Sequence, residues 1–273
     1  MSVMFEWEAG DFDKLVASCE SGVELPYILK YMPREGKIVE AGCGLGRYVA
    51  HLSGIGFDVE GIEINPRTVE QVKEIGPDLN IRQGDVSRMP YGDDSVSGII
   101  SLGVVEHFVE GPSIPLREMR RVLKPGHFAV ISVPSQNILR KVKTFSGYNF
   151  CKERWKRIGI LRRLFRKSPI SPLEKQTALP YTPFYAHARF FEYRLTKREF
   201  ERELTQAGFR IVESVPVAQM DGIYHEYGKA FVSFRNWRFY PHLAGKIVDR
   251  LFSRIPFFHN HMHLCVVRKE SPT

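Results

Sequence analysis

The amino-acid sequence predicts an α/β fold in which a doubly wound parallel sheet is covered by helices on both faces. From Lys37 to Val133, apolar segments of strand type alternate with segments of helical type, and their connections are short. Strands and helices that alternate in this way form a parallel sheet. The alternation stops after Pro134 and resumes at Thr196. The sheet is therefore expected to take strands from both halves of the chain.

The expected elements follow from apolar runs and from helix-capping residues. Asn65-Pro66 is a cap followed by proline at the first helical position, and Thr196 with Glu199 forms a capping box. Seven strands are expected at residues 37–41, 57–64, 79–83, 96–102, 127–133, 209–215 and 261–267. Helices are expected at residues 47–53, 66–75, 112–123 and 196–207.

Composition places the chain among ordinary globular proteins. Its 273 residues are 43% hydrophobic and 26% charged, and no apolar run approaches the roughly 20 residues of a membrane-spanning helix. The first eight residues are acidic rather than signal-like. The four cysteines are scattered and form no C-x-x-C pair, which disfavours a zinc site or a disulfide framework. A cytoplasmic protein with reduced thiols is expected.

Charge is distributed unevenly and suggests three parts. Residues 1–134 hold 13 Lys/Arg against 20 Asp/Glu, residues 135–192 hold 13 against 3, and residues 193–273 hold 13 against 8. We expect 1–134 to form the first part of the core, 135–192 a basic insertion, and 193–273 the rest of the core. A second, aromatic-rich irregular stretch is expected at 216–260. Both stretches follow strands, so both are expected at the carboxyl edge of the sheet, where ligands bind in open α/β folds.

A glycine-rich turn follows the first expected strand. Gly42, Gly44 and Gly46 alternate directly before a helix, and Glu40 precedes the first of them by two residues. Such a turn lets backbone N–H groups approach a ligand at a helix N-terminus. The G-x-G-x-G spacing differs from the G-x-G-x-x-G of dinucleotide sites, which disfavours a nicotinamide-dependent oxidoreductase. Taken alone, the turn has a plain strand-to-helix connection as its less favoured alternative.

Three acids stand at the ends of successive expected strands: Glu40, Glu63 and Asp85. Glu63 lies 23 positions after Glu40, where a carboxylate can accept hydrogen bonds from both hydroxyls of a ribose. Asp85 is placed to accept from an adenine amino group. A solvated strand-end acid is the alternative for each residue separately, but the set together with the glycine turn indicates a nucleoside site.

At this point the chain resembles the class I S-adenosylmethionine-dependent methyltransferases, most closely the small-molecule type. The resemblance covers roughly residues 35–134, with a weaker match after 193. It implies a Rossmann-like sheet of seven strands in which the last strand is antiparallel and inserts between the fifth and sixth. The matching blocks are 39–46, 61–65, 84–91, 99–108 and 116–127.

The resemblance also implies roles for individual residues. The three glycines would let the backbone pass close to the methionine part of the cofactor, and Glu40 would interact with its amino end. Glu63 would hold the ribose, Asp85 would contact the adenine edge, and Ser101 would present backbone to the amino acid moiety. The implied cofactor contacts are Glu40, Gly42, Cys43, Gly44, Gly46, Glu63, Ile64, Asp85, Val86, Ser101 and Leu102.

Methyl transfer from a sulfonium is an in-line displacement, so positioning supplies most of the catalytic effect. A base is needed when the acceptor is a hydroxyl or a protonated amine. His107, just past the fourth expected strand, is the first candidate by position. Other candidate bases are Glu106, Tyr185, His187, Tyr224, His225 and Glu226. Tyr185, His187, Tyr224 and His225 are also the candidate substrate residues. For Tyr224, His225 and Tyr227, the alternative is aromatic packing of the insertion onto the sheet.

Two further patterns have competing interpretations. His259, His261 and His263 alternate, which invites a metal site, but no acid or cysteine is spaced to complete one and no metal is expected. Residues 152–167 form a basic amphipathic stretch. It is interpreted as a helix over the cofactor, as a contact with an anionic membrane or lipid substrate, or, less favourably, as a nucleic-acid contact.

The sequence therefore predicts a methyltransferase that binds S-adenosylmethionine, releases S-adenosylhomocysteine and methylates a small-molecule or lipid-like acceptor. The alternatives are a non-catalytic cofactor-binding adaptor that docks on a membrane or an acidic partner, and an RNA methyltransferase. The sequence identifies neither the acceptor atom nor the oligomeric state.

Overall fold

The computed structural model describes residues 10, 12–145, 182–184 and 192–271. Seven strands form one sheet in the order β3-β2-β1-β4-β5-β11-β8, in which β11 is antiparallel to both of its neighbours and the other pairs are parallel. The strands are β1 (Ile38–Ala41), β2 (Val59–Glu63), β3 (Ile81–Gln83), β4 (Val96–Leu102), β5 (Leu123–Pro134), β8 (Phe209–Val217) and β11 (Met262–Lys269). The predicted sheet and the antiparallel last strand are confirmed.

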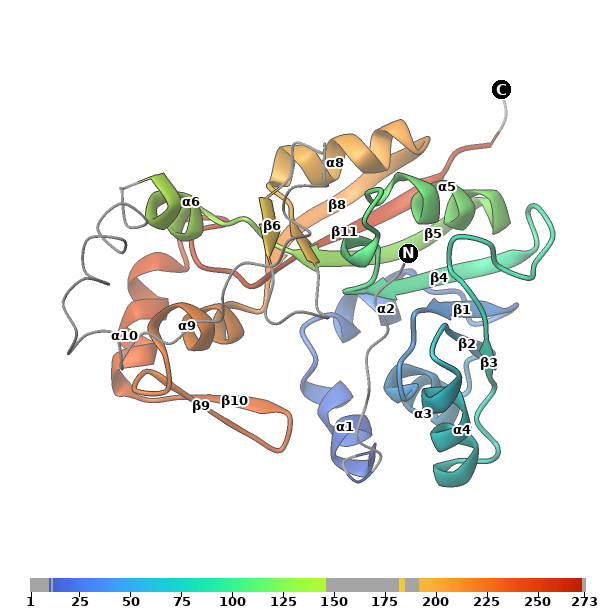
Figure 1. The fold of residues 1–273 in the computed structure, drawn as a ribbon, viewed down its shortest axis with the longest axis horizontal. Coiled ribbons are helices and arrows are strands. Elements are labelled where there is room, and N and C mark those ends of the chain that lie inside the picture. Colours follow the sequence, from blue (N-terminus) through green and yellow to red (C-terminus); the bar gives the residue numbers. More distant parts are fainter. Residues whose placement is uncertain (1–9, 11, 146–181, 185–191, 272–273) are drawn as a thin grey trace.

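Helices cover both faces of this sheet, as expected of a doubly wound fold (Figure 1). On one face, the buried side chains of α5 and α8 join the core of β1, β4, β5 and β11. On the other face, α2 and α3 pack against the opposite side chains of the same strands. The helices of the core are α1 (Phe12–Ser18), α2 (Leu25–Tyr31), α3 (Arg47–Gly54), α4 (Pro66–Ile75), α5 (Ser113–Val122) and α8 (Lys197–Gln206), with 3-10 turns η2 (Cys19–Ser21) and η3 (Val105–His107).

Local capping signals were reliable guides to the helix ends. The Asn65 side chain accepts from the backbone N–H of Arg67, and Pro66 stands at the first helical position of α4. Thr196 and Glu199 make both hydrogen bonds of the capping box at the start of α8. The expected strand 127–133 is longer than predicted, because β5 already begins at Leu123. Lys124-Pro125-Gly126 lies inside the strand, where the register with β4 shifts between Val96 and Gly98.

The expectation that 216–260 is irregular is wrong. This stretch contains α9 (Gln219–Tyr227), the hairpin of β9 (Val232–Arg235) and β10 (Arg238–Pro241), and α10 (Leu243–Phe252). The hairpin turn at Asn236-Trp237 has positive φ at both residues but no glycine, so it lacks the usual sequence signal. In α10, Leu243, Ile247 and Leu251 are exposed, so its apolar stripe does not mark a core-facing helix.

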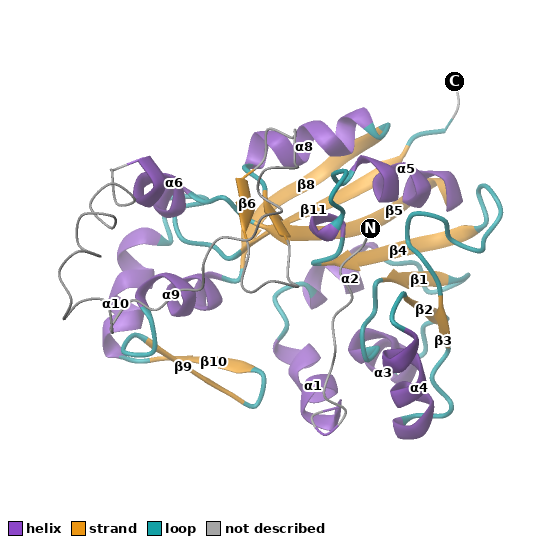
Figure 2. Cartoon of the chain, in the orientation of Figure 1, coloured by secondary structure: helices purple, strands orange, loops and turns teal. Residues whose placement is uncertain are grey.

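Further elements follow β5 at the same edge. Within the described part of 135–192, α6 (Ile138–Phe145) follows β5, and β6 (Thr182–Phe184) pairs with β7 (Glu192–Arg194). In Figure 2, α6, α9 and α10 lie together beyond the carboxyl end of β5. The basic stretch 152–167 lies outside the described residues.

No helix in the described part of the chain is both long and apolar enough to cross a membrane. Cys19, Cys43 and Cys265 are buried free thiols, and Cys151 lies outside the described residues. These three described cysteines are therefore not paired with one another.

Candidate functional site

The glycine loop, residues 42–46, turns the chain sharply between β1 and α3. Gly42, Gly44 and Gly46 have φ values of +80°, +56° and +75°. A Cβ at Gly42 would lie 2.6 Å from Val104, and one at Gly46 would lie 2.1 Å from Ile81. Two of the three glycines are thus required by close packing as well as by backbone conformation. The sequence predicted the turn but not these neighbours.

Glu63 ties the glycine loop to the end of β2. The backbone N–H of Gly44 donates to Glu63 Oε2 over 3.0 Å, and that of Asn65 donates to Oε1 over 2.8 Å. Burial raises the pKa of this carboxyl, and the hydrogen bonds from Asn65 and Gly44 oppose the rise. Each carboxylate oxygen can accept a further hydrogen bond. The side chain is therefore a fixed acceptor beside the loop.

Glu40 is buried below the loop, where it contacts α3. The backbone N–H of Val49, in the first turn of α3, donates to Glu40 Oε2 over 3.1 Å. Burial raises the pKa of Glu40 to about 8, while Arg47 lowers it and Glu63 raises it further. The described contact of Glu40 thus stabilises the helix that follows the loop.

The remaining predicted contacts stand at the ends of β2, β3 and β4. Asp85 Oδ1 accepts from the backbone N–H of Ser87 over 2.8 Å, and Val86 is buried beside it. Ile64 is half-buried after β2, and so is Leu102 at the end of β4. Ser101 is buried, and its Oγ has no hydrogen-bond partner within the described residues. Together with Glu40 and the glycine loop after β1, the predicted residues therefore lie along one edge of four adjacent strands, β3, β2, β1 and β4.

Glu106 and His107 follow β4 in η3. Glu106 is 1% exposed, and burial raises its pKa well above the usual range, with Glu192 adding to the rise. No described residue accepts or donates a hydrogen bond at Glu106 Oε2. His107 Nε2 lies 3.9 Å from Glu106 Oε1, and the histidine side chain is 13% exposed. The sequence favoured His107, and the structure also places the buried carboxyl of Glu106 beside it.

The β9–β10 hairpin reaches back to the glycine loop. Trp237, at its turn, packs against a cluster that contains Leu45 of the loop and Leu15 of α1. Arg238 Nη2 donates to the backbone oxygen of Ala17 over 2.8 Å. Residues 216–260, which contain this hairpin, therefore bridge the two ends of the sheet's carboxyl edge. No sequence signal indicated this contact.

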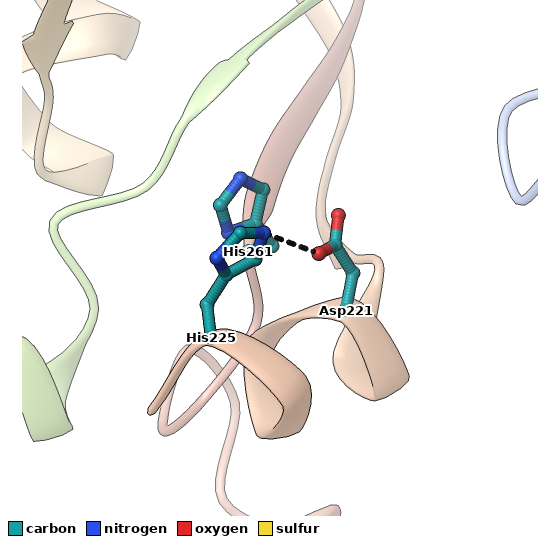
Figure 3. Close-up of side chains that lie close together, drawn as sticks. All are labelled: Asp221, His225 and His261. Carbon is teal, nitrogen blue, oxygen red and sulfur yellow. Dashed lines mark ion pairs between the residues drawn. The ribbon is translucent and has the colours of Figure 1, made fainter. Parts of the chain in front are cut away.

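A second polar group, the histidine cluster, lies at the other end of this edge and consists of Asp221, His225 and His261 (Figure 3). One ligand-type atom from each residue lies within 4.8 Å of the others. Asp221 and His225 are one turn apart on α9, and His261 directly precedes β11. His225 and His261 stack with ring centroids 4.6 Å apart and planes at 22°.

The three alternating histidines do not share one site. His259 Nε2 lies 3.5 Å from Asp249 Oδ1, and His263 Nε2 lies 2.8 Å from Ser214 Oγ. Only His261 joins the histidine cluster among the described residues, and its partners come from α9. The residues at 259 and 261 precede β11, so the expected strand alternation does not apply to them.

Of the predicted substrate residues, His225 lies in the cluster and Tyr224 packs on aromatic neighbours. The Tyr224 ring contacts Phe239 and Phe234 of the hairpin, with centroid distances of 5.6 and 6.2 Å. This favours the packing interpretation of Tyr224. Tyr185 and His187 lie outside the described residues.

The first half of the chain is similar in sequence to known methyltransferases. The sequence model of the family described as "Methyltransferase domain" matches residues 39–131. A probable S-adenosylmethionine-dependent methyltransferase of Mycolicibacterium smegmatis is 30% identical over 36% of this chain and 38% of its own length. A demethylmenaquinone methyltransferase of Chlorobaculum parvum is 28% identical over 40% of this chain and 46% of its own. The match thus spans less than half the length of these relatives.

Solved structures extend the similarity to the whole fold. An S-adenosylmethionine-dependent methyltransferase of Mesorhizobium loti has a TM-score of 0.55 at 15% identity, covering 92% of this chain and 100% of its own. A putative methyltransferase of Haloferax volcanii, solved in complex with the activator Trm112, has a TM-score of 0.54 at 19% identity, covering 94% and 98%. Residues 39–131 thus match a methyltransferase domain in sequence, and the chain shares the fold of S-adenosylmethionine-dependent methyltransferases of known structure.

Proposed function

We propose that this protein transfers a methyl group from S-adenosylmethionine to a small-molecule or lipid-like acceptor. The observation that carries the proposal is the position of Glu63. Its carboxylate is fixed between the glycine loop and the end of β2, in the segment that the family model covers. A carboxylate in this place suits the two hydroxyls of a ribose.

The residues at this edge fit the cofactor. The loop glycines adopt positive φ and bring the backbone close to the site, Asp85 lies at the next strand end, and the Oγ of Ser101 is buried with no partner among the described residues. Glu63, Ile64, Asp85 and Val86 would hold the adenosine part. Gly42, Cys43, Gly44, Gly46, Ser101 and Leu102, with Glu40 behind the loop, would hold the methionine part.

When bound, the cofactor supplies an electrophilic methyl group on a sulfonium. The protein's own contribution is to hold an acceptor atom in line with that methyl group, at about 3–3.5 Å. His107 and the buried Glu106 stand where β4 ends and would line the pocket from that side. The hairpin contact with the glycine loop would help to exclude water from it.

The acceptor class rests on the sequence relatives and on the insertions. Relatives at 28% identity are named for demethylmenaquinone and indolepyruvate, which are small organic molecules. Residues 135–192 and 216–260 would close the acceptor pocket. Peripheral contact of 152–167 with an anionic membrane would suit a lipid-like acceptor, but these residues lie outside the described part of the chain.

Calorimetric titration with S-adenosylhomocysteine tests the proposal. We expect saturable binding by the unaltered protein, abolished by Gly44→Leu. Glu63→Ala should weaken it about 10- to 100-fold, because a hydrogen bond to a charged group contributes about 1.5–3 kcal/mol. Glu70→Ala, which removes an exposed acid of α4, is the matched control. Absence of binding by the unaltered protein would refute the proposal, and binding without turnover on any cell extract would favour a non-catalytic adaptor.

A further inference from the structure

The histidine cluster is built around a buried arginine. Arg140 of α6 is 4% exposed, and its Nε donates to Glu226 Oε1 over 2.7 Å while Nη1 donates to the backbone oxygen of Ser135 over 2.6 Å. Arg140 Nη2 lies 2.9 Å from His261 Nδ1. Three segments distant in sequence are thus fixed against one another: the end of β5 with α6, α9, and the start of β11.

The contact with Arg140 determines where the proton of His261 resides. A guanidinium can only donate, so His261 Nδ1 must accept and its proton must be on Nε2. Burial lowers the pKa of His261 to about 3, and Arg140 adds to this effect while Asp221 opposes it. The ring is therefore neutral near pH 7, with an N–H rather than a lone pair at Nε2.

This protonation state argues against a metal ion. A metal bound at Nε2 would need the proton on Nδ1, where the guanidinium of Arg140 stands. Nδ1 itself is already occupied by that donor. The fixed positive charge would also repel a cation. The cluster therefore has the residue types of a metal site but not the protonation state of one.

His225 has the features of a base. Its side chain is 50% exposed, and its Nε2 lies 3.1 Å from Asp221 Oδ1, whose side chain is 20% exposed. A carboxylate at Nε2 favours the tautomer with the proton there, which leaves the lone pair on Nδ1. The groups that face His225 are Asp221 on its own helix, the neutral ring of His261, and Arg140 behind that ring.

The cluster adjoins the end of β4. Glu192 of β7 raises the pKa of Glu106, so the two carboxyl groups are near one another, and Glu192 accepts from Arg194 Nε over 3.1 Å. Arg140 lowers the pKa of Arg194 and Glu226 raises it, which places these charges near Arg194 as well. A more direct link is Met262, which follows His261 and whose Cε lies 3.8 Å from where a Cβ of Gly103 would stand. The cluster thus lies on the acceptor side of the edge that carries the cofactor residues.

We propose that His225, oriented by Asp221, is the base that removes the proton from a hydroxyl group of the acceptor. This inference rests on the proposed methyl transfer. As the acceptor oxygen forms its bond to the methyl carbon, the sulfur–methyl bond breaks with its electron pair remaining on sulfur, and the hydroxyl proton passes to His225 Nδ1. The products are a methyl ether and the neutral thioether.

The test measures kcat and KM against pH, with tritium-labelled S-adenosylmethionine and the fraction of cell extract that accepts the label. We expect His225→Gln to lower kcat by about 100-fold or more and Asp221→Asn by about 10-fold with an altered pH profile. The affinity for S-adenosylhomocysteine should remain unchanged in both. His51→Gln on α3 is the control, since its half-buried histidine lies on a helix outside the cluster.

Three results separate the possible outcomes. A His225→Gln variant that keeps kcat within about threefold of the unaltered enzyme would overturn the proposal. Binding of Zn²⁺ or Mn²⁺ that is lost in His225→Gln would overturn it in favour of a metal site. Failure of the unaltered protein to bind S-adenosylhomocysteine would instead refute the proposed function. In ¹⁵N-histidine spectra, the neutral Nε2–H tautomer of His261 is expected, and the Nδ1–H tautomer would contradict the argument from Arg140.

Discussion

The two ends of the carboxyl edge are built from opposite chemistry. The cofactor half, formed by the glycine loop and the ends of β1, β2 and β4, buries carboxyl groups such as Glu40, Glu63 and Glu106. The acceptor half, formed by the ends of β5 and β8, the start of β11, α6 and α9, buries Arg140 and His263 and half-buries His261. The cofactor half gathers residues from short, contiguous motifs. The acceptor half joins residues more than 120 positions apart.

This difference indicates how each half is held in place. In the cofactor half, side chains fix nearby backbone, as Glu63 fixes Gly44 and Glu40 fixes Val49. In the acceptor half, side chains fix other side chains across segments, as Arg140 fixes His261 and Glu226. The acceptor half therefore depends on tertiary packing to a greater degree.

The largest expected effect is at a close approach in the acceptor half. A Cβ at Gly222 of α9 would lie 1.7 Å from the backbone oxygen of His259, which has no flexible end that could move away. Gly222→Ala should lower the free energy of unfolding by about 3 kcal/mol, measured by urea denaturation. Gly54→Ala, at the end of α3 with nothing within 4 Å, is the control and should not destabilise the protein. Equal stabilities of the two variants would contradict the close approach of α9 to His259.

A smaller effect is expected at the corresponding position of the cofactor half. Gly46 has φ +75°, and its Cβ would meet only the terminal Cδ1 of Ile81 closely, at 2.1 Å. Gly46→Ala should therefore cost about 1–2 kcal/mol, from backbone strain and repacking. Gly56 has a similar φ of +87° but nothing within 4 Å of its Cβ position. Gly56→Ala therefore measures the cost of backbone strain alone. If the Gly46 variant were no less stable than the Gly56 variant, the Ile81 side chain would have to move aside at no cost, which would contradict the prediction.

The two halves should also respond oppositely to pH. Burial raises the pKa of Glu40 from 4.5 to about 8, so the folded state retains a proton that the unfolded state releases, and stability falls as pH rises through this window. Burial lowers the pKa of His261 from 6.5 to about 3, so stability falls as pH decreases through that window. Above pH 6.5, where His261 no longer contributes, urea denaturation should show a loss of at least about 1 kcal/mol in the free energy of unfolding as the pH rises to about 8; this range is the alkaline side of the profile. Glu40→Gln should flatten that side alone, and an unchanged alkaline slope would contradict the burial of a neutral Glu40.

The smallest expected effect reports on the contact between the halves. Trp237 packs against the cluster that includes Leu45 of the glycine loop. Binding of S-adenosylhomocysteine should change the tryptophan fluorescence of the unaltered protein, and Trp237→Phe should remove that change. A fluorescence change that persists in the variant would mean that ligand binding at the glycine loop does not alter the surroundings of Trp237.

Much of the core was predictable because its signals are local. Asn65-Pro66, the Thr196–Glu199 capping box and the glycine turn each specify backbone geometry within a few residues, and the structure bears out all three. The Lys124-Pro125-Gly126 segment was misjudged because its place in β5 depends on a register shift against β4. The α9–α10 region was missed because its hairpin turn has no glycine and its helix α10 exposes its apolar residues.

In the candidate site, too, the residues that follow from local sequence signals were predictable and those brought together by tertiary packing were not. The candidate cofactor residues at the ends of β1 to β4 were predicted from spacing and family resemblance. The histidine cluster was not, because Arg140, His225 and His261 approach one another only when β5, α9 and β11 are packed together. The pattern of alternating histidines pointed instead to a strand face that His259 and His261 do not occupy.

Hydrogen–deuterium exchange with and without S-adenosylhomocysteine tests most directly whether the cofactor binds at the glycine-loop half of the carboxyl edge. We predict that the ligand protects backbone amides of the glycine loop, of residues 63–65 and 85–87, and of the segment after β4, while α9 and residues 257–261 change little. Protection concentrated on α9 and 257–261, with the glycine loop unaffected, would contradict the assignment of the cofactor to the first half of the edge.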